Sequence, residues 1–380
     1  MPVNVRFVSY ILLAAIALTT IAKLAHFHAT KSYQPSDLLS DSRQTAPLAN
    51  ATKVNPPAKQ EDEAAQSPFA FVAFLADNWQ HKEFDDDNED IYFYSTRVMG
   101  YQLMHNSETR SNTSIPFVVL TTKGVSERKR ARLRKDGAVV IVVEDVPLPD
   151  WFSIGNPFWV DVMTKLRVFQ QTQYEKILLL DADVLPVRRL DGVFQDPATE
   201  VIAPLQDKKR EGDKIPLPAT YMFAGMTNGG GREHDSETEE KYYESMAKYG
   251  ELEQVNAGFL LAAPSQEMYD YYTSVLHEEG RFDPAQPEQN LLIEAHRLDG
   301  PLPWKSIRYD WVINSPNFQD YEHGVHAVHE KLWKGEHRIE EFGLKDLAAL
   351  WDKARGEMEG YYRALDDPSP TTRRVKAEDG

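Results

Sequence analysis

The sequence predicts an α/β domain built around a mostly parallel β-sheet. Three observations support this fold class: short apolar runs have the composition of strands buried on both faces, helical patterns stand between them, and the two kinds of segment alternate along the chain. A chain of 380 residues with 42% hydrophobic residues can bury a large core. Charged residues make up 27% of the chain, so we expect most of it to fold.

Each element is expected from a local pattern of side chains. Ser126 and Ser265 are placed to cap helices, Gly137 is placed to end one, and Pro287 fits the first turn of another. In chain order we expect strands at 69–75, 115–121, 138–143, 176–180 and 255–262, and helices at 126–137, 159–173, after 265, and at 287–296. A final amphipathic helix, expected to pack on the domain surface, is indicated by Leu347, Trp351, Ala354 and Met358.

The first 25 residues differ from the rest of the chain. Arg6 precedes an apolar run at 7–22, which Lys23 closes. The run is shorter than the roughly 20 residues of a full membrane span, but the long side chain of Lys23 can reach the interface. We therefore expect residues 1–25 to form a cytoplasmic tail and a signal-anchor helix. A cleaved signal peptide, with weak small-residue cleavage sites at 17–25, and a buried soluble helix remain the alternatives.

Residues 26–67 are rich in small and polar residues and predict a disordered stem, because they cannot bury enough apolar surface to fold alone. We expect the main folded domain at 68–343, and a C-terminal amphipathic helix and tail at 344–380. The order of anchor, stem and domain predicts a single-pass membrane protein of type II topology. Asn50 and Asn112 begin acceptor sequons for N-glycosylation, which are informative only in a luminal chain.

The composition excludes several kinds of site. The chain has no cysteine, so it has no disulfide, zinc-thiolate site, iron–sulfur cluster or catalytic thiol, although a lack of disulfides leaves the secretory pathway open. The net charge of −17 gives no chain-wide basic surface, so we expect no nucleic-acid partner. An anionic ligand would need a metal ion or local lysines to bind.

The segment Asp181-Ala182-Asp183 follows directly on a predicted buried strand that ends at Leu180. Ligands of open α/β sheets bind beyond the carboxyl ends of the strands. In an extended segment the two carboxylates would point to the same side, and together they could hold one hard cation such as Mg²⁺ or Mn²⁺. Such a cation could stabilise a departing diphosphate. The alternative is a strand-end turn with capping carboxylates; the acidic run at 85–87 is interpreted as a solvated loop.

Several motifs occur in a fixed order between residues 165 and 333 of the chain. They are Lys165 to Phe169, Tyr174 to Leu185, Leu190 to Phe194, Asn256 to Leu261, Glu288 to Leu292 and Val328 to Trp333. Together they resemble the glycogenin-like retaining glycosyltransferases, family eight of the sugar-transferase classification. The resemblance implies a single nucleotide-sugar-binding domain of the GT-A type with a Rossmann-like sheet. It also implies transfer of a sugar from a UDP-sugar donor with Mn²⁺, or Mg²⁺, as cofactor.

The resemblance also assigns roles to particular residues. The metal ligands would be Asp181, Asp183 and His329; the family position favours His329 over the nearby His326 among 11 histidines. The residues nearest the reacting sugar would be Gln289, Asn256 and Glu288, with Glu288 replacing the family's usual Asp, so the choice of sugar does not transfer. The residues that bind the donor would be Lys165, Asp77, Ala182, Ala257, Gly258 and Lys334. Lys331 competes with Lys334 for the diphosphate, because the family's spacing after the histidine is not kept.

The resemblance implies retention at the anomeric carbon, and we favour front-face substitution because such enzymes lack an obvious nucleophile. The donor phosphate would help to take the acceptor proton while Gln289 and Asn256 orient the sugar. One alternative is a nucleotidyltransferase, which would carry a glycine-rich loop after the first strand, whereas 75–80 contains no glycine. Another is a catalytically silent nucleotide-sugar-binding protein of the same fold, which would have lost the metal carboxylates.

The sequence leaves the donor sugar and the acceptor open. UDP-glucose, UDP-N-acetylglucosamine, UDP-galactose and UDP-glucuronate all fit the pattern, and the acceptor could be a glycan, a protein or a lipid. For a membrane-anchored enzyme of this kind we expect the domain to lie in the Golgi lumen. It would be secreted if the N-terminal segment is cleaved.

Overall fold

The computed structural model describes residues 67–77, 89–153, 161–210, 215–229, 231–249 and 253–367. They all lie in one unit of the chain, Glu61–Gly380. The predicted anchor at 1–25, nearly all of the predicted stem and the acidic run at 85–87 lie outside the described residues. Among the helices that are described, none combines the length and the apolar character needed to cross a membrane.

A central sheet of seven strands organises this unit, in the order β3-β2-β1-β4-β7-β6-β8. Only β7 runs antiparallel to its neighbours, so the predicted mostly parallel α/β sheet is confirmed. The strands are β1 (Phe69–Leu75), β2 (Phe117–Thr121), β3 (Val139–Val142), β4 (Lys176–Leu180), β6 (Phe223–Thr227), β7 (Val255–Ala262) and β8 (Lys305–Ser306).

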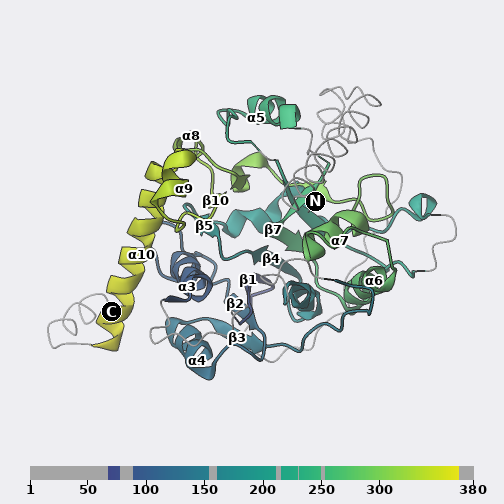
Figure 1. The fold of residues 1–380 in the computed structure, drawn as a ribbon, viewed down its shortest axis with the longest axis horizontal. Helices are drawn as coiled ribbons and strands as arrows, with labels where there is room; N and C mark the ends of the chain where they lie inside the picture. Colours follow the sequence, from purple (N-terminus) through teal and green to yellow (C-terminus); the bar gives the residue numbers. More distant parts are fainter. Residues whose placement is uncertain are drawn as a thin grey trace, which may run out of the picture. The chain divides into compact units, whose positions relative to one another are not determined.

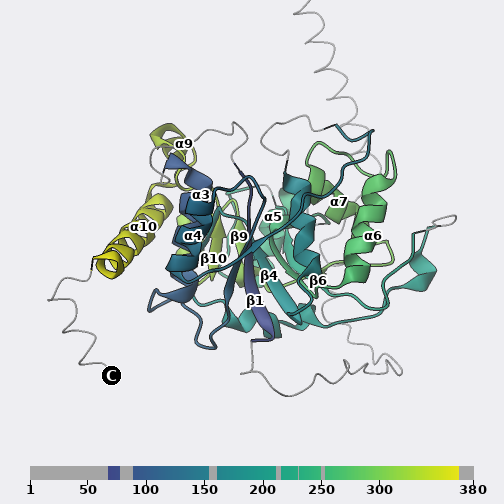
Figure 2. The same ribbon diagram turned by 90° about the horizontal axis from the view of Figure 1, so that it is seen from below.

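Helices cover both faces of the sheet, which explains why its central strands are apolar on both sides. Figure 2 shows α3 (Ile91–Met104) and α4 (Glu127–Asp136) on one face, and α6 (Gln266–His277) and α7 (Pro287–Ala295) on the other. The long helix α10 (Lys345–Asp366) lies against the outer side of α3 (Figure 1). Its four predicted apolar positions are all buried: Leu347, Trp351, Ala354 and Met358.

The predicted signals for helix ends are confirmed. The Ser126 hydroxyl accepts a hydrogen bond from the first turn of α4, and Gly137 ends this helix in the left-handed conformation, with φ of 109°. Ser265 caps α6 in the same way as Ser126 caps α4, and Pro287 is the first residue of α7. Local capping chemistry therefore sets these boundaries.

One predicted helix takes a different form. The segment expected as an α-helix at 159–173 contains a 3₁₀ helix, η3 (Val162–Gln170). Met163, Leu166 and Phe169 recur every three residues and are at most 2% exposed. This spacing matches the three residues per turn of a 3₁₀ helix, so burial of the three side chains favours the tighter winding.

A second, smaller sheet links distant parts of the chain. In it β10 (Ala327–His329) pairs antiparallel with β5 (Val184–Pro186) and parallel with β9 (Ile313–Asn314). The register places His329 opposite both Val184 and Asn314. The remaining elements are short: α5 (Glu239–Met246), α8 (Phe318–Glu322), α9 (Glu336–Glu341), η4 (Asp191–Gln195), η5 (Pro197–Thr199), η6 (Gln206–Lys208), η7 (Ala247–Tyr249) and η8 (Tyr309–Trp311).

Candidate functional site

The two carboxylates of the Asp-x-Asp motif lie in a tight turn between β4 and β5. The N–H of Val184 donates to the carbonyl of Asp181 at 3.0 Å, which closes the turn, and the N–H of Asp181 donates to the carbonyl of Gly258 at 2.9 Å. The sequence had suggested an extended segment at this place, and the structure shows a tight turn instead. Both side chains nevertheless belong to one cluster, in which Asp181 is 34% exposed and Asp183 is 10% exposed.

His329 joins this cluster because β10 pairs with β5. Its Nε2 atom is 3.1 Å from Oδ1 of Asp183, although the two residues are 146 positions apart. One ligand atom from each of Asp181, Asp183 and His329 lies within 4.8 Å of the others. Two carboxylate oxygens and one imidazole nitrogen at this spacing are a donor set that fits Mn²⁺ or Mg²⁺.

The other side of the His329 ring is also held in place. Its Nδ1–H donates to Oδ1 of Asn314 at 2.9 Å, and Nδ2 of Asn314 donates to the carbonyl of Thr227 at 2.7 Å. A histidine ligand commonly has a second partner of this kind, which fixes its tautomer and leaves the other nitrogen for the metal. Nε2 of His329 is therefore the atom available to a cation.

Gly258 makes the approach of His329 possible. A Cβ atom at this position would lie 2.3 Å from Cε1 and 2.8 Å from Nε2 of the His329 ring. Gly258 also donates its N–H to Oδ1 of Asn256 at 2.8 Å. Any side chain at position 258 would displace the imidazole, so this glycine is required by the histidine itself.

Lysines neutralise the acidic side chains of the cluster. Nζ of Lys165 is 2.6 Å from Asp181 and 3.2 Å from Glu288, and the ammonium group of Lys331 contacts Asp183. Burial lowers the pKa of Lys165, but the carboxylates of Asp181 and Glu288 raise it by more. The net pKa lies above its usual value, so this amine stays charged. The site therefore contains fixed cations that can face an anionic ligand.

Burial and these charges together shift the pKa values of Glu288, Asp183 and His329. Burial raises the pKa of Glu288 to about 7, against the attraction of Lys165. Burial also raises the pKa of Asp183, but His329 and Lys331 outweigh it and leave that pKa below its usual range. The same pairing raises the pKa of His329 although burial lowers it. A metal ion would have to replace a proton on His329 and the ammonium group of Lys331.

The residues predicted to face the sugar lie together at the start of β7 and α7. Oε1 of Gln289 accepts the N–H of Ala257 at 3.1 Å, and Nδ2 of Asn256 donates to Asn228 at 2.9 Å. Glu288 is linked to Asp181 through Lys165, which contacts both carboxylates. The structure thus brings Gln289, Asn256 and Glu288 to one side of the predicted metal ligands, and their catalytic roles remain predictions.

Other predicted binding residues lie around this centre. Asp77 follows β1, where its N–H donates to the Thr122 hydroxyl at 3.3 Å, and the carbonyl of Ala182 accepts from Ser95 at 2.9 Å. Lys334 is exposed, and its N–H donates to the carbonyl of Lys331 at 3.1 Å. The structure therefore places Lys331, rather than Lys334, on the carboxylate of Asp183.

His326 lies outside the cluster. Its ring centroid is 4.4 Å from that of Trp311, and its Nδ1–H donates to the carbonyl of Arg189 at 2.6 Å. These contacts give His326 a structural role, and the choice of His329 as the metal ligand stays a prediction.

Sequence reasoning missed several residues that border the site. Asn314, Ser95 and Tyr92 were not predicted to take part; the Tyr92 ring is 44% exposed and lies 6.0 Å from Trp333. A helix at 91–104 would have placed Ser95 and Tyr92 beside the strand ends, but its polar and apolar residues show no clear helical stripe.

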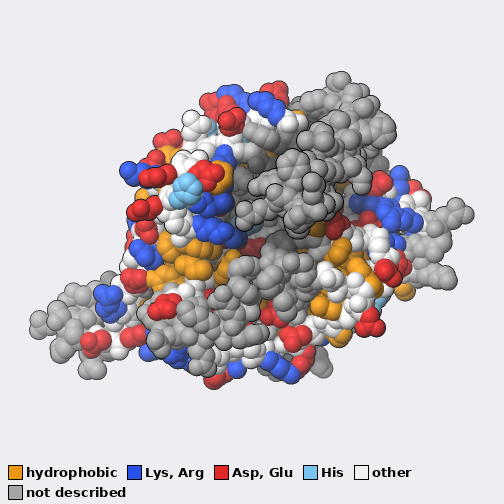
Figure 3. Space-filling model, in the orientation of Figure 1, with side chains coloured by type: hydrophobic (Ala, Val, Ile, Leu, Met, Phe, Trp, Pro, Cys, Tyr) orange, Lys and Arg blue, Asp and Glu red, His pale blue; other side chains and the backbone are white. Residues whose placement is uncertain are grey.

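On the face drawn in Figure 3, acidic and basic side chains of the described residues are interspersed rather than separated.

Comparison with known proteins adds sequence relatives to this geometry. No protein-family profile matches the chain. Two uncharacterized proteins of Schizosaccharomyces pombe are each 29% identical over 72% of this chain and 75% and 77% of their own lengths. Two Arabidopsis thaliana proteins match shorter stretches. Galactinol synthase 4 is 29% identical over 39% of this chain and 40% of its own length. Inositol phosphorylceramide glucuronosyltransferase 1 is 27% identical over 36% of this chain and 24% of its own length. The two Arabidopsis relatives support a sugar transferase.

Solved structures show a weaker likeness. The glycosyltransferase GlyE of Streptococcus pneumoniae TIGR4 aligns over 77% of this chain and 64% of its own, with a TM-score of 0.39 and 15% identity. Mouse xyloside xylosyltransferase 1 aligns over 69% of this chain and 97% of its own, with a TM-score of 0.36 and 9% identity. These TM-scores are too low to establish a shared fold.

Proposed function

We propose that this protein is a retaining glycosyltransferase of the GT-A type that uses a UDP-sugar donor and a divalent cation, preferably Mn²⁺. The observation that carries the proposal is the cluster of Asp181, Asp183 and His329, whose ligand atoms lie within 4.8 Å of one another at the carboxyl end of β4. Ligands of mostly parallel sheets bind at this edge. The sugar-transferring relatives from Arabidopsis support the same class of reaction.

The three clustered residues would hold the cation, with diphosphate and water oxygens as its other ligands. When bound there, the cation would supply charge stabilisation to the departing diphosphate. Lys165 keeps the carboxylate of Asp181 oriented through their 2.6 Å contact. Lys331 pairs with Asp183, so a cation that took this carboxylate would leave the ammonium group of Lys331 for the donor phosphates.

The reaction we favour is front-face substitution. The bond between the anomeric carbon and the phosphate oxygen breaks, the acceptor hydroxyl oxygen bonds to the same face, and its proton passes to the departing phosphate. No protein base is needed in this scheme. Gln289, which accepts the N–H of Ala257, and Asn256, the residue before Ala257, would hold the sugar in the reactive orientation. Glu288, buried beside Lys165, would bind sugar hydroxyls and take part in the choice of sugar.

A screen of UDP release tests this proposal. The full chain is incubated with Mn²⁺ and, separately, with UDP-glucose, UDP-N-acetylglucosamine, UDP-galactose and UDP-glucuronate. We expect release of UDP from at least one donor, and NMR of the freed sugar or product should show the anomer of the donor. Turnover that survives an excess of EDTA, or a product of inverted configuration, would contradict the proposal.

We further propose that the catalytic domain is luminal, in the Golgi, behind an N-terminal anchor. This rests on the sequence alone, through the apolar run at 7–22 and the stem that follows it. Protease treatment of intact vesicles tests it. The domain should survive without detergent and be digested with it, and complete digestion of the domain in sealed vesicles would contradict the topology.

A further inference from the structure

Glu330 occupies a special place in the chain, between His329 and Lys331. Both neighbours direct their side chains to Asp183, whereas the Glu330 carboxylate is only 6% exposed and contacts two arginines from other segments. Glu330 directly follows β10, and the N–H of Leu332 donates to its carbonyl at 2.8 Å, so the chain turns at this point. The contacts of Glu330 with the two arginines therefore hold the backbone from which His329 and Lys331 reach Asp183.

The Glu330 residue is held through both its side chain and its backbone. Oε1 accepts from Arg338 at 2.9 Å and from the N–H of Lys331 at 2.8 Å, and the other carboxylate oxygen contacts the guanidinium of Arg232. The backbone N–H of Glu330 donates to the carbonyl of Asp183 at 3.0 Å. One residue thus ties the segment 329–331 to the metal turn, to α9 and to the segment that carries Arg232.

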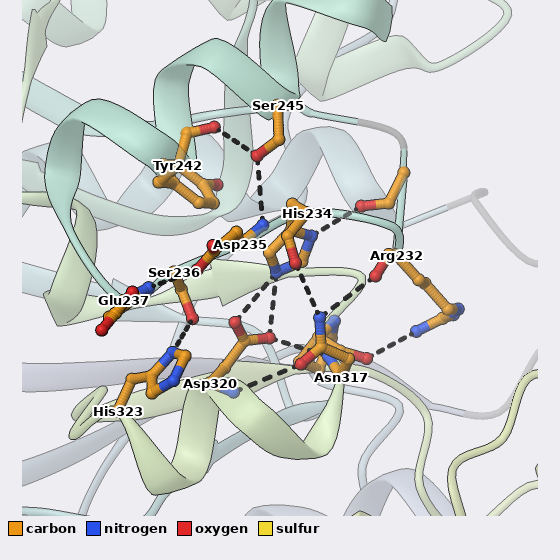
Figure 4. Close-up of polar contacts among 12 residues, drawn as sticks. Arg232, His234, Asp235, Ser236, Glu237, Tyr242, Ser245, Asn317, Asp320 and His323 are labelled. Carbon is orange, nitrogen blue, oxygen red and sulfur yellow. Dashed lines mark hydrogen bonds and ion pairs between the residues drawn. The ribbon is translucent and has the colours of Figure 1, made fainter.

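The segment around Arg232 is itself held by a buried polar network (Figure 4). Nδ2 of Asn317 donates to the carbonyl of Arg232 at 3.1 Å, and the His234 ring lies between the carbonyl of Gly231 and the carboxylate of Asp320, each at 2.9 Å. The His234 and Asp320 side chains are fully buried. This arrangement gives Arg232 a fixed backbone from which to hold Glu330.

We propose that Glu330 is a positioning residue for the metal site, acting through His329 and Lys331; this inference rests on the function proposed above. A metal–nitrogen distance tolerates a deviation of only about 0.2 Å, so a small rotation of the segment 329–331 is enough to weaken the site. Loss of a partner outside the ligand set commonly lowers metal affinity about 10- to 100-fold. Removal of the Glu330 charge also takes from Arg232 and Arg338 the carboxylate that both of them contact.

The competing explanation is that Glu330 merely stabilises the fold around α9. The chain offers a matched control on α7, because the Glu294 carboxylate, 15% exposed, is also paired with arginines. It is 2.7 Å from Arg281, 3.1 Å from Arg210 and 3.9 Å from Arg297. Replacing Glu294 by Gln removes the same kind of ion pair at a place that does not contact the predicted ligands.

The experiment compares E330Q and E294Q with the wild type as full chains. Mn²⁺ affinity is measured by calorimetry and by the EPR signal of free Mn²⁺, and folding is checked by thermal unfolding. We expect E330Q to weaken Mn²⁺ binding at least about 10-fold, whereas E294Q should bind as the wild type does, with a similar or larger loss of Tm. R338Q, which removes one of the two arginines, should weaken binding by a smaller factor, and it decides the question if E330Q does not fold.

The outcomes separate the two proposals. If E330Q binds Mn²⁺ as tightly as the wild type, the positioning role is overturned and the proposed function stays intact. If E330Q does not fold, wild-type affinity of R338Q has the same consequence. Equal weakening by E330Q and E294Q would also overturn it, since it would reflect general destabilisation. A wild type that binds no Mn²⁺, even with UDP, would overturn the proposed function and this inference together.

Discussion

Substitution of Gly258 by alanine adds one methyl group beside the predicted metal site and removes no polar group. The new Cβ would lie 2.3 Å from Cε1 of His329, whereas ordinary van der Waals contact begins at 3.4 Å, so the ring must move by the difference, about 1.1 Å. Gly258 lies in strand β7 and is not among the glycines with positive φ, so alanine fits its backbone. The clash with His329 is therefore the main consequence of the substitution.

A displacement of this size separates Nε2 of His329 from the 3.1 Å contact with Asp183 and takes it out of ligand range. We expect Gly258→Ala to weaken Mn²⁺ binding by about 100-fold, equivalent to about 2.7 kcal/mol. The overall fold should survive, because the three atoms nearest the added Cβ all belong to side chains and none to the backbone.

The assay is a calorimetric titration of Mn²⁺ into the wild type and the variant, with thermal unfolding as a check of folding. Gly356 provides the control, because it lies in α10 and nothing stands within 4 Å of a Cβ added there. Gly356→Ala should leave Mn²⁺ affinity unchanged and add up to about 1 kcal/mol of stability through helix propensity. Wild-type Mn²⁺ affinity in folded Gly258→Ala would refute the assignment of His329 as a ligand.

Four further predictions follow from the same structure. Removal of any predicted ligand should lower UDP release at least ~100-fold, on the scale of about 3 kcal/mol of lost charge stabilisation, in Asp181→Ala, Asp183→Ala and His329→Ala. His326→Ala should keep wild-type Mn²⁺ affinity in the calorimetric titration, because its ring packs on Trp311 instead. A truncated chain without residues 1–67 should stay soluble and retain donor turnover, since the first core strand begins at Phe69; aggregation would contradict this. Burial lowers the pKa of His296 from 6.5 to about 3, so the unfolded chain binds the proton first as the pH falls. As the pH falls from 6.5 to about 3, the free energy of unfolding measured in urea should therefore fall by about 1.4 kcal/mol per pH unit. A His296→Phe variant should lack this part of the pH dependence.

The strands that the sequence predicts best are those buried on both faces. The bounds of β1, β4 and β7 match the predicted runs, because burial on both faces makes every residue of such a strand apolar. Helix ends with local capping chemistry were equally readable, as Ser126 and Gly137 show for α4. Signals of this kind are contained in a few neighbouring residues.

Helix α3 shows where such reading fails. Nearly all of its residues from Phe93 to Leu103 are buried, between the sheet on one side and α10 on the other. A helix covered on both sides has no polar face, so it lacks the period of 3.6 residues on which recognition depends. Ser95 and Tyr92, which lie on this helix near the site, were missed for that reason.

The candidate site could be predicted only in part. The Asp-x-Asp motif and the family resemblance pointed to Asp181, Asp183 and His329, and the structure brings all three together. Asn314 and Lys331 take their places through the pairing of β10 with β5 and β9, which joins segments far apart in the sequence. No local pattern encodes that pairing, so the partners of the ligands emerge only from the fold.

The most direct test of the central claim is a crystal of the protein grown with Mn²⁺ and UDP, with X-ray data collected at an energy where manganese scatters anomalously. The account predicts one strong anomalous peak at about 2.0–2.3 Å from a carboxylate oxygen of Asp181, a carboxylate oxygen of Asp183 and Nε2 of His329, with diphosphate oxygens completing the shell. A bound UDP with no manganese at these three residues, or a manganese peak held by other side chains, would contradict it.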